Sequence, residues 1–213
     1  MTERRFAYPM VLDLAGRRAV VVGGGRVALR KARALAEAGA RVTAVAPEFL
    51  PEFADEAGVE RIEATYKADH LAGAVLVIAA TDDAAVNRRV ADDARAAHVL
   101  ANVVDVPEQC DFIVPAQVRR GDLLIAITTG GAAPSLSRRL RERLEGEFGP
   151  EWAEYLAQVR AVRERVLAEG HPPEVRRRIF ERLTEPDIVE AARVGPDALR
   201  RAIDTALAEA RRG

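Results

Sequence analysis

Three consecutive glycines, Gly23 to Gly25, are the residues whose spacing points most directly to chemistry. With Ala28 they fit the pattern Gly-x-Gly-x-x-Ala, a dinucleotide-binding fingerprint whose third small position is alanine. Gly23 allows a sharp turn, Gly25 lets the backbone approach a pyrophosphate, and Ala28 lets a helix pack closely on a strand. A helix that starts here points its N-terminal amides and the positive end of its dipole at the phosphates.

The residues around the glycines supply the elements that this fingerprint requires. The β-branched run at residues 19–22 predicts a buried strand, and the apolar spacing after Gly25 predicts a helix that ends near Gly39, with Val27 among its inward residues. A second strand at residues 42–46 completes a βαβ unit. This context favours nucleotide binding over the alternative, a glycine turn without a ligand.

The acidic residue that usually holds the ribose should end the second strand. In this chain Ala46-Pro47-Glu48 stands there instead. Glu48, one or two positions late, is the candidate for the ribose contact, and a carboxylate at that place favours NAD over NADP.

Composition limits the class of partner. The 213 residues carry a net charge of -1 and are 49% hydrophobic, which allows a sizeable core and argues against a nucleic-acid or membrane-surface binder. No apolar run approaches the ~20 residues needed to cross a bilayer, and residues 1–10 do not resemble a secretory signal. The histidines show no metal-ligand spacing, and the single Cys110 fits a reducing compartment. We therefore expect a cytoplasmic protein without a metal site.

Strands and helices alternate through the first half of the chain. Thr81-Asp82-Asp83 are capping residues that predict a helix running to about Ala97. The spacing predicts further elements: a lead-in strand or arm at residues 8–14, a short helix at 51–57, and strands at 62–66, 75–80 and 99–104. Such an alternation predicts an α/β fold with a Rossmann-like, doubly wound parallel sheet.

The pattern changes after Cys110. The next predicted elements are strands at 112–115 and 123–128, a loop at 128–134, a helix with Leu136, Leu140 and Leu144 on one stripe, and continuous helix from Glu151 onward. We therefore predict three parts, namely a Rossmann domain at 1–113, a small α+β segment at 114–148 and a C-terminal helical domain at 149–213.

Ligands of open parallel sheets lie beyond the carboxyl ends of the strands. The segments that collect there are the Gly23 loop, Pro47-Glu48, Thr81 to Asp83, and Asn102 to Asp105. Asp82 and Asp83 are more typical of helix caps than of catalysts. Asp105 ends a buried strand in an expected partly dry place, where a carboxylate could act as a general base. A turn-forming aspartate before Pro107 is the alternative, and both interpretations stay open.

Two features of the second half also have two interpretations. The loop at 128–134 offers hydroxyls and amides to an anion, and a structural turn explains it equally well. The arginines at 138–143 and 176–178 have glutamates close by, which favours a solvated, salt-bridged face, although a few could meet an acidic substrate.

Several segments taken together resemble the precorrin-2 dehydrogenase family, which includes the N-terminal module of sirohaem synthase and its stand-alone relatives. They are residues 22–32 (Val-Gly-Gly-Gly-x-Val-Ala-x-Arg-Lys-Ala), 79–87 (Ala-Ala-Thr-Asp-Asp-x-x-Val-Asn), 102–107 (Asn-Val-Val-Asp-x-Pro), 112–116, 120–123 and 129–134. The match covers about residues 8–145 in order, whereas the region after Glu151 matches only in helical character.

The resemblance implies NAD-dependent dehydrogenation of precorrin-2 to sirohydrochlorin, often followed by ferrous-ion insertion to give sirohaem; whether this chain inserts iron stays open. It also implies a homodimer formed through residues 114–148, and it gives Asp105 the catalytic role. With the motif residues, the predicted NAD site comprises Gly23, Gly25, Arg26, Val27, Pro47, Glu48 and Thr81. The predicted substrate-binding residues are Asn102, Thr129, Gly130 and Gly131.

Two other classes of protein are alternatives to this one. A non-catalytic NAD-sensing regulatory module explains the first half equally well, but it does not explain residues 102–107 and 128–134, and the C-terminal helices carry no DNA-reading motif. A hydroxy-acid dehydrogenase would need a histidine beside an arginine in the second half, and no candidate pair is present.

Overall fold

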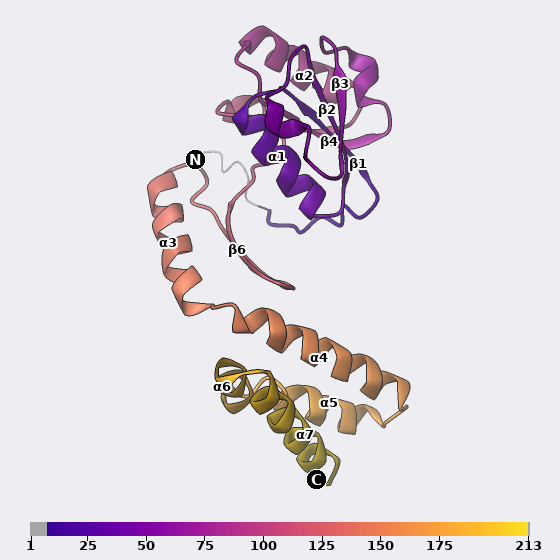
Figure 1. Ribbon diagram of the computed structural model, residues 1–213, viewed down its shortest axis with the longest axis vertical. Helices are drawn as coiled ribbons and strands as arrows, with labels where there is room; N and C mark the ends of the chain where they lie inside the picture. Colours follow the sequence, from indigo (N-terminus) through magenta and orange to yellow (C-terminus); the bar gives the residue numbers. More distant parts are fainter. Residues whose placement is uncertain (1–7, 213) are drawn as a thin grey trace. The chain divides into compact units, whose positions relative to one another are not determined.

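The computed structural model describes residues 8–212 (Figure 1). The chain divides into two compact units, and the boundary in the sequence lies between Val114 and Pro115. The first unit is built on a parallel sheet with the strand order β3-β2-β1-β4-β5. Its strands are β1 (Arg18–Val22), β2 (Arg41–Ala46), β3 (Val59–Glu63), β4 (Ala74–Ala79) and β5 (Leu100–Val103). The order reverses between β1 and β4, where ligands of such sheets bind. The predicted Rossmann-like α/β fold is confirmed.

Helices α1 (Arg26–Glu37) and α2 (Ala84–Ala96) cover opposite faces of this sheet. Successive side chains of a strand point to opposite faces. In β1, Val20 and Val22 therefore pack with the buried residues of α2, whereas Ala19 and Val21 pack with those of α1. A strand that is buried on both faces needs a continuous apolar sequence, and residues 19–22 have one.

Three predicted elements of the first unit differ in the structure. The strand expected at 62–66 is β3, which ends at Glu63, because Tyr66 leaves the sheet and fills the core beneath α2. The helix expected at 51–57 is a single 3-10 turn, η1 (Pro51–Phe53). Residues 8–14 form no strand, and only Leu14 of this arm is buried. Short 3-10 turns η2 (Ala68–Leu71) and η3 (Pro107–Gln109) complete the unit.

The second unit opens with an antiparallel hairpin, β6 (Ala116–Arg120) and β7 (Leu123–Ile127). The prediction of a strand at 112–115 is wrong. The two-residue turn at Gly121 pairs Arg120 with Leu123, and in this register the first residue of the hairpin, Ala116, pairs with Ile127. Gly121 has a φ of 57°, which suits a turn of this kind. Helix α3 (Pro134–Glu147) follows, and Ser137 is its only buried residue.

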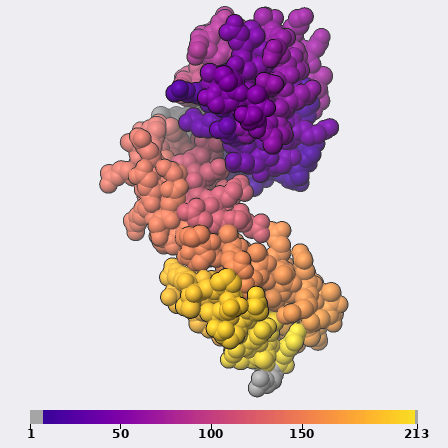
Figure 2. Space-filling model, viewed as in Figure 1, coloured from indigo at the N-terminus to yellow at the C-terminus, as the bar shows by residue number. Residues whose placement is uncertain are grey.

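Four helices form the rest of the second unit: α4 (Glu151–Ala168), α5 (Pro173–Arg182), α6 (Pro186–Val194) and α7 (Pro196–Arg212). The predicted apolar stripes of α4 and α7 meet in one core, in which Val166, Leu199 and Ile203 are buried. In Figure 2 the atoms of these four helices, coloured orange to yellow, pack into one body. The expected salt-bridged surface is present, as in the pairs Arg141–Glu145 (2.6 Å) and Arg177–Glu181 (3.2 Å). Among residues 8–212, no helix is long and apolar enough to span a membrane.

Candidate functional site

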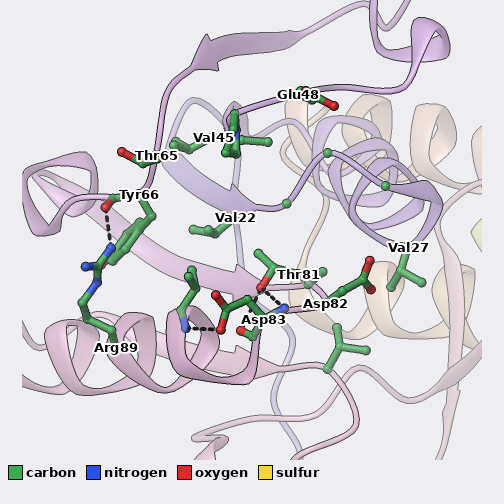
Figure 3. A pocket seen from close by; sticks show the side chains of 18 of the residues that line it. Val22, Val27, Val45, Glu48, Thr65, Tyr66, Thr81, Asp82, Asp83 and Arg89 are labelled. Carbon is green, nitrogen blue, oxygen red and sulfur yellow. Dashed lines mark hydrogen bonds between the residues drawn. The ribbon is translucent and has the colours of Figure 1, made fainter.

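A cavity of about 1030 Å³ lies at the carboxyl ends of the strands of the first unit (Figure 3). Its walls come from the glycine loop, from the segments that follow β2, β3, β4 and β5, and from α2. Of the predicted site residues, it is lined by Gly23, Gly25, Arg26, Val27, Pro47, Glu48, Thr81 and Asp105. The fold thus brings the predicted cofactor residues and the predicted catalytic residue to one cavity.

The three glycines have three different surroundings. A Cβ on Gly23 would lie 2.4 Å from the Ala80 carbonyl oxygen, and one on Gly24 would lie 1.9 Å from that of Glu48. A Cβ on Gly25 would meet nothing within 4 Å. The first two glycines therefore let neighbouring backbones pack closely, whereas Gly25 leaves open space at the wall of the cavity.

The N-terminus of α1 faces this open space. No side chain caps it at Gly25, and its first turn contains no acidic residue. The first-turn amides and the dipole are therefore available to an anionic group. Val27 was expected to point inward, but it is 39% exposed and lines the cavity, while Ala28 and Leu29 are buried instead. These features fit the pyrophosphate of a dinucleotide.

The loop after β2 brings Pro47 and Glu48 to the cavity. Both are exposed, and the loop is tied to the glycine turn by a 2.9 Å hydrogen bond from the Leu50 amide to the Gly24 carbonyl. Glu48 is thus held beside the glycines although it stands later than the usual acidic residue. A carboxylate there fits the hydroxyls of a ribose.

The loop after β4 forms hydrogen bonds with the first turns of α2. Thr81 Oγ1 donates to Asn87 Oδ1 (2.8 Å), and the Asn87 side-chain amide donates to the Thr81 carbonyl oxygen (2.9 Å). Asp83 is the N-cap of α2, and its Oδ1 accepts from the amides of Ala85 (2.8 Å) and Val86 (3.2 Å). The cap interpretation is confirmed for Asp83, whereas Asp82 caps nothing and lines the cavity.

Replacing Asp83 by Ala should lower the free energy of unfolding by about 1 kcal/mol, because two first-turn amides of α2 lose their acceptor. Thermal unfolding of the purified variant measures this. Asp82→Ala is the matched control, since it removes the neighbouring carboxylate without removing the cap. Equal losses in both variants would contradict the assignment.

Asp105 follows β5 in a left-handed conformation, with a φ of 61°. Few residue types other than glycine adopt this region, although aspartate and asparagine do so more often than most. The expectation of a partly dry place is wrong, since Asp105 is exposed. The charge of Asp105 does affect the pKa of Lys31 in α1. Burial and, to a lesser extent, the charge of Arg30 lower that pKa, whereas the Asp105 carboxylate raises it. Asp105 is therefore both a turn residue and a charged wall of the cavity.

The predicted substrate residues are not among those that line the cavity. Asn102 is buried and donates from its side-chain amide to the Phe112 carbonyl oxygen at 2.9 Å. It points away from α2 because Ala101 and Val103, its neighbours in β5, face that helix. Thr129, Gly130 and Gly131 belong to the second unit, where Thr129 Oγ1 accepts from the Ala133 amide at 3.1 Å. Their contacts with a substrate stay predictions.

Sequence reasoning missed one end of the cavity. Thr65, Tyr66 and Lys67, after β3, line it together with Arg89 of α2. No motif marks these residues, and the only available signal was an isolated aromatic residue, Tyr66, in a polar stretch.

Cys110 is buried, and its sulfur accepts from the Val103 amide at 3.2 Å. Within residues 8–212, no cluster of three or more acidic, histidine or cysteine residues could hold a metal ion.

Residues 10–116 match a protein-family model described as "Putative NAD(P)-binding", and residues 120–147 match one described as "Sirohaem biosynthesis protein central". A siroheme synthase of Nitrosospira multiformis is 40% identical over 201 residues, which are 91% of this chain and 43% of that protein. A siroheme synthase of Chromobacterium violaceum is 41% identical over 198 residues, 92% of this chain and 42% of that protein. The chain thus spans less than half the length of these curated relatives.

Among solved structures, the fold is similar to that of a protein named SirC, precorrin-2 dehydrogenase. The TM-score is 0.74 with 24% sequence identity, and the similarity covers 93% of this chain and 98% of that one. At this identity the likeness concerns the fold, and it extends over both units.

Proposed function

Because the chain belongs to the family of precorrin-2 dehydrogenase and the corresponding module of sirohaem synthase, we propose that it oxidises precorrin-2 to sirohydrochlorin with NAD. The observation that carries the proposal is the single cavity that holds Gly25, the uncapped start of α1, Glu48 and Asp105. The match of residues 120–147 to a sirohaem-biosynthesis family disfavours the NAD-sensing alternative.

The residues of the cavity can each be given a task. The amides at the start of α1 bind the pyrophosphate, and the open space at Gly25 lets it approach the backbone. Glu48 accepts hydrogen bonds from ribose hydroxyls. When bound there, NAD supplies the acceptor for the hydride that leaves the macrocycle. The oxidation removes a hydride and a proton together, and Asp105 accepts the proton as a general base.

The proposal is tested by an anaerobic assay of the purified chain with precorrin-2 and NAD, in which NADH and sirohydrochlorin are followed by their absorption spectra. Formation of both supports the dehydrogenase. Ferrous iron is then added as a substrate, and a sirohaem spectrum that develops faster than without protein supports iron insertion as a second activity. NAD binding without any turnover of the tetrapyrrole would favour a sensor.

We also propose that the chain forms a homodimer through residues 114–148. In α3 the predicted leucine stripe is not covered within the described part of the chain, since Leu136 is 46% exposed and Leu140 and Leu144 are only partly buried. An apolar stripe of this kind is typical of a surface that a second subunit covers.

The single, buried Cys110 suits a reducing compartment, so we propose a cytoplasmic location.

Replacing Leu136 by Asp should convert the dimer to a monomer, because a carboxylate would be buried against apolar residues without a partner. Sedimentation velocity measures the change. The matched control is Ser135→Asp on the neighbouring exposed position, which should leave the dimer intact. A wild-type chain that sediments as a monomer would exclude the proposed dimer.

A further inference from the structure

The cavity has an end that no part of the proposed mechanism uses. In Figure 3, Val27 and Asp82 lie at one side, Tyr66 and Arg89 lie at the opposite side, and Val22 lies between them. The topology agrees with this view, because Tyr66 follows the edge strand β3 whereas Asp105 follows the other edge strand, β5. The unused end is therefore far across the sheet from the proposed catalytic carboxylate.

Arg89 is held in place at this end by Tyr66. Its Nη2 donates to the Tyr66 carbonyl oxygen at 2.6 Å, and its Cζ lies 5.4 Å from the centre of the Tyr66 ring. Tyr66 is itself only 4% exposed, so the platform beneath the guanidinium is fixed by the core. Burial, followed by the charge of Asp93, raises the pKa of the Tyr66 phenol still further above physiological pH.

The contacts with Tyr66 orient the Arg89 guanidinium, and neither of them is with a carboxylate. Among the described residues no carboxylate oxygen lies within 4.0 Å of the Arg89 guanidinium, and Arg89 is an exposed residue. Its remaining N–H groups and one planar face are therefore available to a ligand. Val22, Val45 and Val86 line the same cavity with apolar side chains, and Thr65, which is exposed, also lines it. A flat, weakly polar ring with hydrogen-bond acceptors on its edge fits such a place.

A dinucleotide whose pyrophosphate lies on α1 and whose ribose meets Glu48 continues in the direction of this end. We propose that Arg89, oriented by Tyr66, binds the adenine ring of the cofactor by stacking and by donating to its edge. Arg89 is then a residue that binds the cofactor's adenosine half and takes no part in the chemistry. The inference rests on the proposed use of NAD.

The test is calorimetric binding of AMP, ADP-ribose and NAD to the full chain and to Arg89→Ala. All three ligands carry the adenine, so each should bind about tenfold more weakly to the variant. In the dehydrogenase assay, the KM for NAD should rise by the same factor while kcat at saturating NAD stays unchanged. Arg88→Ala is the matched control, because Arg88 is the preceding exposed arginine of α2 and does not line this cavity.

Three results would overturn the inference. The first is unchanged AMP binding in Arg89→Ala, whether or not NAD binding falls. The second is full recovery of affinity in Arg89→Lys, which keeps the charge without the planar group. The third is a wild-type preference for NADP that Arg89→Ala abolishes, which would assign the arginine to a 2′-phosphate. AMP binding does not require turnover, so failure of the precorrin-2 assay is distinguishable from failure of this assignment.

Discussion

Replacing Asp105 by Asn is expected to slow precorrin-2 oxidation about a hundredfold or more, the range for loss of a positioned general base. Asparagine is chosen as the replacement because it lacks the carboxylate charge and can still adopt the backbone conformation of Asp105. Asp105 has a φ of 61°, and asparagine adopts that region as readily as aspartate does. The substitution therefore removes the carboxylate and keeps the turn. Single-turnover formation of NADH and sirohydrochlorin measures the rate.

Two comparisons separate this role from a general effect of charge. Asp82 is another exposed carboxylate that lines the same cavity and caps no helix, so Asp82→Asn removes the same charge without removing the base. It should keep most of the rate, and both variants should bind NAD within about twofold of wild type, since neither residue belongs to the proposed NAD contacts. Equal rates in Asp105→Asn and wild type would leave Asp105 with the turn-forming role alone.

The sequence was most informative where one local pattern determines both the element and its function. The glycine spacing predicted the turn, the start of α1 and the wall of the cavity, because small residues are required where backbones approach within contact distance. Periodicity was less reliable at the ends of elements. Val27 fits the apolar spacing of α1, yet it lies in the first turn, beyond the part of the helix that the sheet covers.

What the sequence could not predict depends on contacts between distant segments. Tyr66 and Arg89 are 23 positions apart, and only the course of the chain after β3 brings them together. Asp105 is exposed, and β5 ends at Val103 rather than at the expected residue 104. The hydrogen bond from Asn102 to the Phe112 carbonyl oxygen likewise depends on a segment ten positions away, toward which the alternation of side chains along β5 directs Asn102. The substrate contact of Asn102 stays a prediction.

The glycines provide the second large effect, because Gly24 and Gly25 are neighbours with opposite surroundings. In Gly25→Ala, the backbone φ of -88° is one that alanine adopts and the new methyl meets no protein atom within 4 Å, so the free energy of unfolding should stay within about 0.5 kcal/mol of wild type. The methyl would instead occupy the space through which a pyrophosphate approaches the backbone. NAD affinity should fall about a hundredfold, or nearly 3 kcal/mol.

Gly24→Ala, in contrast to Gly25→Ala, should mainly lower the stability of the fold. Its methyl would lie 1.9 Å from the Glu48 carbonyl oxygen, a backbone atom that can move only with its loop, and the Leu50 hydrogen bond to Gly24 would be strained. We expect a loss of about 1–3 kcal/mol in the free energy of unfolding, as for other overpacked sites. Denaturant unfolding and calorimetric NAD binding, measured on both variants, test the pair. A stable Gly25→Ala variant that binds NAD like wild type would mean that the cofactor does not approach α1 at Gly25, and the nucleotide site would have to lie elsewhere in the cavity.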